Sequence, residues 1–314
     1  MAEASQNSNR KNSNETWLGS LLIAASAIAY SSAGFFTRLI DLDIWTVLFW
    51  RGWFAGLFIA AYVIWQNGRK TAVAVRAIGW RGLWIAFFST FATICFLNAL
   101  RLTSVAEVTI INATSPFITG LLAWLFLGER ERWTTVMASL LAFAGIIIMF
   151  KPAAAAGHLT GNLLAFAMTI SLAAMVVVLR HSRATSMLPA TCLSAFLCSI
   201  VVWPIAHPGA ASGMNFIYLV LFGTMQFGLG LLLLTIGTRH VTAIRSSLIG
   251  RLQIPLAPAW VWLGFGEVPS VATCIGGLIV VAAIASEALT KRFYAFLRPW
   301  LTRCRRFPSR GPAR

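Results

Sequence analysis

The chain has 314 residues, of which 58% are hydrophobic and only 11% are charged, whereas a soluble domain carries roughly 25% charged residues. Its mean hydropathy is +0.77, so the chain offers too little polar surface to face water on all sides. The formal net charge of +16 does not indicate nucleic-acid binding, because nucleic-acid modules need a solvated basic face. These properties exclude a soluble globular protein and predict one that crosses a membrane several times.

Apolar stretches of the length that crosses a bilayer, about 20 residues, follow one another with short links. The segment 1–16 is polar, and the first apolar run is longer than the core of a cleaved signal peptide. The sequence therefore predicts an all-α transmembrane protein with ten spanning helices. In chain order these are 17–40, 44–66, 83–100, 104–127, 133–150, 161–180, 188–206, 216–238, 242–265 and 271–288.

The chain also contains an internal repeat. Four pairs of residues are separated by one and the same interval: Arg101 and Arg239, Ser104 and Thr242, Trp124 and Trp262, and Glu129 and Glu267. Around the last two pairs the sequence reads W-L-x-x-G-E. Earlier in each half the interval is four residues longer, and there Arg38 corresponds to Arg180. A repeat of this kind predicts a duplicated structural unit.

The domain organisation follows from the repeat. After a polar N-terminal tail, 1–16, we expect a first repeat of five spans at 17–150, a linker at 151–160 and a second repeat at 161–290, followed by a basic tail at 291–314. Because five is an odd number, the second repeat must cross the membrane inverted relative to the first. Inverted repeats place a substrate site near the midplane, between two halves that rock against each other.

Lys and Arg residues are unevenly divided between the two sides of the predicted membrane protein. If the N-terminus is cytoplasmic, most of them fall on the cytoplasmic side, including those of the C-terminal tail, whereas Arg38, Arg101 and Lys151 fall on the other side. Cytoplasmic loops carry the excess of Lys and Arg. Both termini are therefore expected in the cytoplasm, for a multi-pass protein of the cell inner membrane.

The fourth and ninth spans share a further pattern. In the fourth, a run of small and apolar residues leads from Pro116 through a tryptophan-containing segment to Glu129, and in the ninth a similar run leads from Pro255 to Glu267. These paired segments resemble the EamA-type ten-span transporters of the drug/metabolite transporter superfamily. The prolines depart from the repeat register, because Pro116 aligns with Ile254, so the two helix kinks are expected to be inequivalent.

The resemblance extends from residue 17 to about residue 288. It implies a basket of helices around a central cavity, with the fifth and tenth spans peripheral, and secondary transport of a small polar or amphiphilic metabolite. We expect an amino acid or other zwitterion first, or a vitamin such as riboflavin. A lipid-type flippase and a membrane-embedded enzyme are the alternatives.

No enzyme activity, cofactor, metal site or nucleic-acid partner is expected. The partners are the metabolite and the lipid bilayer, and a homodimer is left open.

Charged residues inside spans are the first candidates for the site, because a charge at the bilayer centre costs at least about 2.5–3.5 kcal/mol. Arg251 lies near mid-depth of the ninth span, and Pro255 and Pro258 follow it on the same helical face and free backbone carbonyls beside it. We interpret Arg251 as a cavity residue that contacts a substrate anion. The alternative is a structural arginine bonded to unwound carbonyls.

Two further charged residues are candidates. Arg51 lies in the second span, and the resemblance implies a role in the site that the fold shares, with snorkelling toward the interface as the alternative. Glu107 is the one carboxylate clearly inside a span. It is the candidate proton carrier if protons drive transport, and solvation at the interface is the alternative. Since arginines outnumber carboxylates in the spans, an anionic or zwitterionic solute is favoured.

Neutral polar side chains inside spans complete the set. They could orient a ligand or bridge helices by hydrogen bonds, and an aromatic ring could provide a flat wall. The residues assigned to the substrate site on this basis are Gln253, Asn98, Asn112, Gln226 and Tyr30.

Overall fold

The computed structural model of the protein describes residues 2–102, 105–129, 133–150, 159–266, 268 and 271–286, and every regular element in these ranges is a helix. In the first half they are α1 Ala2–Ser31, α2 Ala33–Leu39, α3 Ile44–Asn67, α4 Thr71–Ala77, α5 Gly79–Leu102, α6 Val105–Asn112, α7 Ser115–Leu127 and α8 Trp133–Phe150. In the second half they are α9 Leu159–His181, α10 Leu188–Val202, α11 Gly213–Leu221, a π-helix Phe222–Gly228, α12 Leu229–Thr238, α13 Ala243–Gly250, α14 Gln253–Phe265 and a last helix Val271–Ser286.

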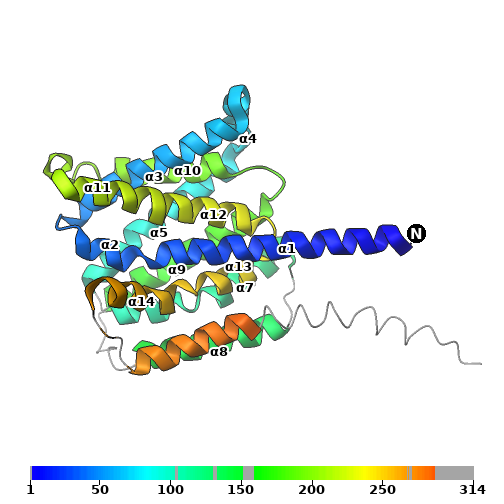
Figure 1. Ribbon diagram of the computed structural model, residues 1–314. Helices are drawn as coiled ribbons and strands as arrows, with labels where there is room; N and C mark the ends of the chain where they lie inside the picture. Colours follow the sequence, from blue (N-terminus) through cyan, green and yellow to red (C-terminus); the bar gives the residue numbers. More distant parts are fainter. Residues whose placement is uncertain are drawn as a thin grey trace, which may run out of the picture.

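The protein is an all-helical, multi-pass membrane protein. By length and composition, the described residues contain five stretches long and apolar enough to cross a membrane: Glu15–Phe36, Ile44–Ala77, Val108–Leu127, Leu159–His181 and Gly213–Thr238. Shorter apolar helices cover Trp133–Ile148, Leu188–Val202 and Val271–Ser286. The segment 1–16, which we expected as a separate polar tail, is helical from Ala2 onward and continuous with the first apolar stretch (Figure 1). The tail 291–314 lies outside the described residues.

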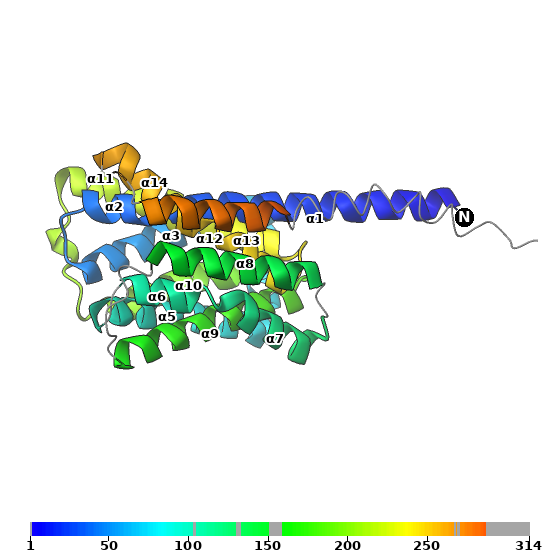
Figure 2. The same cartoon turned by 90° about the horizontal axis from the view of Figure 1, so that it is seen from below.

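The helices pack as a closed ring. α3 contacts α10, α10 contacts α5, α5 contacts α9 and α9 contacts α7; the ring closes through α13, α1 and the π-helix back to α3. α8 and the last helix lie side by side at the edge of the bundle (Figures 1 and 2), where a Cβ added at Gly145 would come within 2.8 Å of the Gly276 carbonyl oxygen. Helices of both halves of the chain therefore alternate around the ring.

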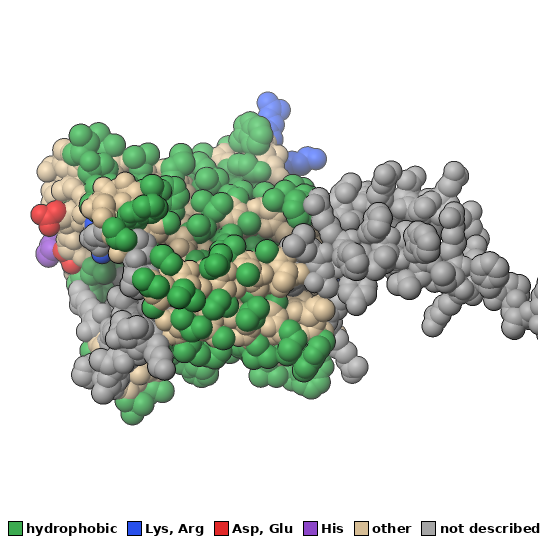
Figure 3. Space-filling view, turned by 60° about the horizontal axis from the view of Figure 1, so that its bottom comes forward, with side chains coloured by type: hydrophobic (Ala, Val, Ile, Leu, Met, Phe, Trp, Pro, Cys, Tyr) green, Lys and Arg blue, Asp and Glu red, His purple; other side chains and the backbone are tan. Residues whose placement is uncertain are grey.

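The surface between the two ends of the bundle is strongly apolar. Figure 3 shows hydrophobic side chains over this face, with acidic and histidine side chains gathered at the end away from the N-terminal helix. Large hydrophobic side chains are widely exposed, as at Trp65 (79%) and Phe126 (72%). Contiguous exposed apolar surface on this scale fits contact with lipid rather than with water.

Two predicted spans are broken in the middle. The fourth consists of α6 and α7, separated by a turn at Ala113 and Thr114, and the ninth consists of α13 and α14, separated by a turn at Arg251 and Leu252. These turns are related by the interval that relates Glu129 to Glu267. The expectation of inequivalent kinks is therefore wrong. Pro116 and Pro255 fall within the first turn of the second helix, where a proline is tolerated, whereas Pro258 lies inside α14. A small shift in the register of the first-turn proline therefore leaves the break in place.

A polar cap fixes the start of α3. The Asp43 carboxylate accepts hydrogen bonds from the backbone N–H and the hydroxyl of Thr46, both at 3.0 Å. The same hydroxyl accepts the backbone N–H of His207 at 2.9 Å. Burial alone would raise the pKa of Asp43, but the hydrogen bonds from Thr46 and Trp45 outweigh it and lower that pKa. The cap thus ties α3 to the loop after α10.

Glycines allow α1 and α12 to pack closely. A Cβ at Gly237 would lie 2.7 Å from Cγ1 of the fully buried Ile23 and 3.0 Å from the Gly19 carbonyl oxygen.

Gly237→Leu should therefore lower the free energy of unfolding by about 1–3 kcal/mol, the usual effect of overpacking, and this can be measured by thermal unfolding in detergent. The matched change Gly209→Leu, where nothing lies within 4 Å, should leave the melting temperature unchanged. Equal melting temperatures for the two variants would contradict this packing.

Candidate functional site

The two broken helices are joined through a carbonyl that a proline leaves free. Pro116 has no N–H, so the carbonyl of Asn112, four residues earlier, lacks its usual helical donor. Nη1 of Arg251 donates to this oxygen at 2.9 Å. Arg251 comes from the break in the other half of the chain and is only 7% exposed. Its guanidinium thus replaces the backbone donor that the fourth span has lost.

Arg251 also bonds to backbone carbonyls at the break between α13 and α14, where it lies. Its backbone N–H bonds to the Leu248 carbonyl at 3.0 Å, which leaves the Ser247 carbonyl without its usual helical donor, and its Nε donates there at 3.4 Å. Beside it, the Ser115 and Ser247 hydroxyl oxygens lie 2.9 Å apart across the two helices. Of the two carbonyls that Arg251 reaches, that of Asn112 was freed by Pro116, and neither was freed by Pro255 or Pro258. These contacts favour the structural alternative for Arg251.

Arg51 has a different environment. It lies on α3 and faces the π-helix, where its Cζ is 4.4 Å from the ring centroid of Phe227 and 5.5 Å from that of Phe222. Such cation–π contacts stabilise a desolvated guanidinium by roughly 2 kcal/mol, but they leave its N–H donors unused. Its Nε is buried and has no hydrogen-bond partner. A buried donor without a partner is costly, and a ligand oxygen would supply the missing acceptor.

Gln226 and Tyr30 lie beside Phe227, the ring that Arg51 contacts: Gln226 precedes Phe227 in the π-helix, and the Tyr30 ring centroid is 6.5 Å from that of Phe227. Nε2 of Gln226 donates to the Tyr30 carbonyl at 3.4 Å, while its Oε1 is buried without a partner. Gly223 lets the π-helix approach α3, because a Cβ there would lie 3.0 Å from the Arg51 carbonyl oxygen. Gly230 faces the Tyr30 ring at 3.1 Å. The structure therefore brings three of the predicted residues together, from α1, α3 and the π-helix.

The remaining predicted residues lie elsewhere. Asn112 is at the break, and its side-chain Oδ1 is buried without a partner. Gln253 is the first residue of α14 and is half-buried. Asn98 donates to the Ile94 carbonyl of its own helix, α5, at 2.9 Å. Glu107 lies on α6, and its side chain falls outside the described residues.

The sequence reading missed the aromatic partners of Arg51 and the π-helix that carries them. Seven residues, Phe222–Gly228, form this π-helix, a feature that is frequent at functional sites. Gly223 and Gly228, near the two ends of the π-helix and each beside a phenylalanine, were the sequence feature that could have pointed to this site. Glycines inside a span indicate close helix packing equally well.

The charge of the interior is positive. Arg51 contacts aromatic rings and Arg251 contacts carbonyl oxygens, and among the described residues neither guanidinium forms an ion pair with a carboxylate. Ring faces and carbonyl dipoles offset a buried cation only in part. This arrangement favours a ligand that carries a negative group.

Comparisons with known proteins agree with this architecture. Residues 17–151 match the EamA-like transporter family. The chain is 26% identical to the S-adenosylmethionine uptake transporter of Rickettsia bellii over 85% of this chain and 90% of the relative. It is 25% identical to the pseudopaline exporter of Pseudomonas aeruginosa over 63% of this chain and 71% of the relative. A solved crystal structure shares the fold, with a TM-score of 0.73 at 19% identity, covering 87% of this chain and 97% of the other.

Proposed function

Because this chain belongs to the EamA-like transporter family and is a transporter rather than an enzyme, we propose that it moves a small zwitterionic or anionic metabolite by alternating access. The observation that carries this proposal is the pair of unused polar atoms in one cluster, Nε of Arg51 and Oε1 of Gln226. A donor and an acceptor beside aromatic rings suit a solute that combines a carboxylate, a hydrogen-bond donor and an apolar portion. An amino acid would offer all three groups, whereas a vitamin such as riboflavin would offer ring carbonyl oxygens in place of the carboxylate.

We place the site in two inverted five-helix repeats, 17–150 and 161–290, with ten spans and both termini in the cytoplasm of an inner-membrane protein. The equivalent breaks in the two halves support this arrangement, since broken helices at corresponding positions of two repeats point to a binding site. The excess of Lys and Arg in the segments expected on the cytoplasmic side supports the orientation. Figure 3 shows acidic side chains at one end of the bundle, and Lys or Arg side chains both beside them and toward the other end.

The roles within the site differ. Arg51 holds the negative group of the solute, Gln226 accepts a hydrogen bond from it, and Phe222, Phe227 and Tyr30 contact its apolar part. Asn112 and Gln253 flank the breaks and are secondary contacts, and Asn98 contributes from α5. Arg251 shapes the site by holding the two breaks together and presents its charge to the interior. Glu107 is the proton carrier if a proton gradient drives the cycle.

Transport by the purified protein in proteoliposomes tests the proposal. The labelled panel should contain neutral amino acids, their amides and decarboxylated amines, riboflavin and a labelled phospholipid, each with and without a pH gradient. We expect exchange of at least one solute that carries both an acceptor and a donor, and much slower movement of the matched compound that lacks the carboxylate. Glu107→Gln should remove stimulation by the pH gradient and leave exchange intact. Selective movement of the phospholipid would instead support the flippase alternative.

A further inference from the structure

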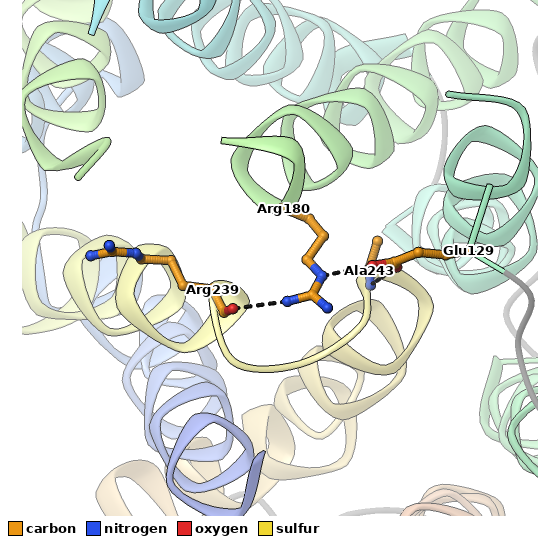
Figure 4. A network of polar contacts seen from close by, with 4 residues as sticks. All are labelled: Glu129, Arg180, Arg239 and Ala243. Atoms are coloured by element: carbon orange, nitrogen blue, oxygen red, sulfur yellow. Dashed lines mark hydrogen bonds and ion pairs between the residues drawn. The ribbon is translucent and has the colours of Figure 1, made fainter. Parts of the chain in front are cut away.

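A polar network joins three helix ends at one end of the bundle (Figure 4). Nε of Arg180, near the end of α9, donates to Oε1 of Glu129 at 2.8 Å. Its Nη1 donates to the Arg239 carbonyl, also at 2.8 Å. The second carboxylate oxygen of Glu129 accepts the backbone N–H of Ala243, the first residue of α13, at 3.4 Å. One ion pair thus links α7, α9 and the turn between α12 and α13.

The geometry of each end directs these contacts. Gly128 adopts a left-handed conformation (φ 65°) that ends α7 and turns Glu129 inward. The Arg180 and Glu129 side chains are only 10% and 20% exposed, so water screens the pair weakly. In the proposed repeats Glu129 belongs to the first and the other three residues to the second. The network therefore spans the boundary along which two rocking halves would separate.

An apolar cluster lies beneath the network. Ala123 of α7, Val176 and Val177 of α9 and Ala243 of α13 pack together, each no more than 8% exposed. Further along α7, Thr119 and Ser115 are also buried and lead to the crossing of the broken helices. Buried side chains thus pack α7, α9 and α13 against one another between the crossing and this end of the bundle.

We propose that Glu129 and Arg180 form a latch that holds this end of the transporter closed and opens during the transport cycle. Opening would replace a charge-assisted pair by two hydrated charges. For a partly buried pair the lost attraction and the regained hydration nearly cancel in free energy. Such a contact can be broken and re-formed without a large barrier. The inference rests on the proposed alternating access and adds the element that controls one side of it.

The repeat relates Arg180 and Glu129 to two residues near the other end of the bundle. In the repeat register Arg38 corresponds to Arg180 and Glu267 to Glu129. Cζ of Arg38 lies 5.9 Å from the ring centroid of Phe265, the last residue of α14, so this arginine is beside the helix end equivalent to that of α7. Glu267 itself lies outside the described residues.

Side-specific labelling tests the latch without knowledge of the substrate. Thr119→Cys, with Ala123→Cys as a second reporter on the same face, is placed in a background with Cys274→Ser and Cys304→Ser. The protein is labelled with a membrane-impermeant maleimide in inside-out and in right-side-out vesicles. Glu129→Gln and Arg180→Gln should each raise the labelling rate about tenfold from the latch side and leave the rate from the opposite side unchanged. Arg180→Lys, which retains the charge, should give an intermediate rate.

Arg183→Gln is the matched control. It removes a nearby exposed arginine whose carbonyl, rather than its side chain, accepts a hydrogen bond from Arg239, so its labelling rate should equal that of the unchanged protein. Unaltered rates in both latch variants would overturn the proposal. Equal increases from both sides would also overturn it, because they would show a general loosening of the bundle. Since no solute is needed, a negative transport assay would count against the proposed substrate class and not against the latch.

Discussion

Arg251→Ala is expected to lower the free energy of unfolding by about 2–4 kcal/mol. The change removes the donors to the Asn112 and Ser247 carbonyls, and each buried carbonyl left without a partner costs roughly 1–2 kcal/mol. Both carbonyls lie at helix breaks, where the backbone offers no replacement. Thermal unfolding of the detergent-solubilised protein measures the loss. Because the breaks shape the site, transport should be lost as well, while membrane insertion is retained.

Two variants separate the contacts of Arg251. Arg251→Gln keeps an N–H that can reach one carbonyl, so we expect about half of the loss in stability. Asn112→Ala removes a side chain whose Oδ1 has no partner and leaves the backbone carbonyl in place, so it should leave stability unchanged. An Arg251→Ala protein as stable as the original would show that the guanidinium does not hold the breaks together, and would return Arg251 to the role of a direct substrate contact.

Arg51→Gln should reduce transport by roughly 10-fold to 150-fold with little effect on folding. A hydrogen bond between a charged donor and a ligand anion is worth about 1.5–3 kcal/mol, and each 1.4 kcal/mol is a factor of ten. Folding should tolerate the change because the lost cation–π contacts with Phe222 and Phe227 are offset by removal of a buried charge whose Nε has no hydrogen-bond partner in the protein. Initial rates of exchange in proteoliposomes, with the solute identified by the panel, measure the effect.

Controls for Arg51 address shape and charge separately. Arg51→Lys keeps the charge but loses the planar guanidinium that lies over Phe227, so transport should fall about tenfold. Arg69→Gln removes an exposed arginine in the short turn just after α3, and this variant should transport at the original rate. Full activity of Arg51→Gln, with normal expression and melting temperature, would remove Arg51 from the site.

The site was only partly predictable. The position of Arg51 and Arg251 within apolar spans marked them as costly charges. The cluster of Arg51, Gln226 and Tyr30 contains three residues that the sequence singled out. Asn98 was singled out for the same reason but bonds to its own helix. Polarity within a span indicates that a side chain needs a partner, and it does not indicate whether the partner is a ligand, another helix or the preceding turn.

Glu129 shows the same limit. The repeated Gly-Glu at the ends of two spans indicated helix-end residues, and the left-handed Gly128 and Gly266 (φ 65° and 70°) are what such ends require. The pairing of Glu129 with Arg180 joins residues far apart in the sequence. Nothing in the local pattern specified this partner.

The sequence by itself determined the membrane class, the duplicated segments and the equivalent positions in the two halves, because lipid demands long apolar helices and duplication leaves its register in the chain. Only the tertiary structure decided where the helices break, that a proline in one half is compensated by an arginine from the other, and that Arg51 lies on aromatic rings without an acceptor. These are contacts between helices, and their geometry depends on how the whole ring closes rather than on any single span.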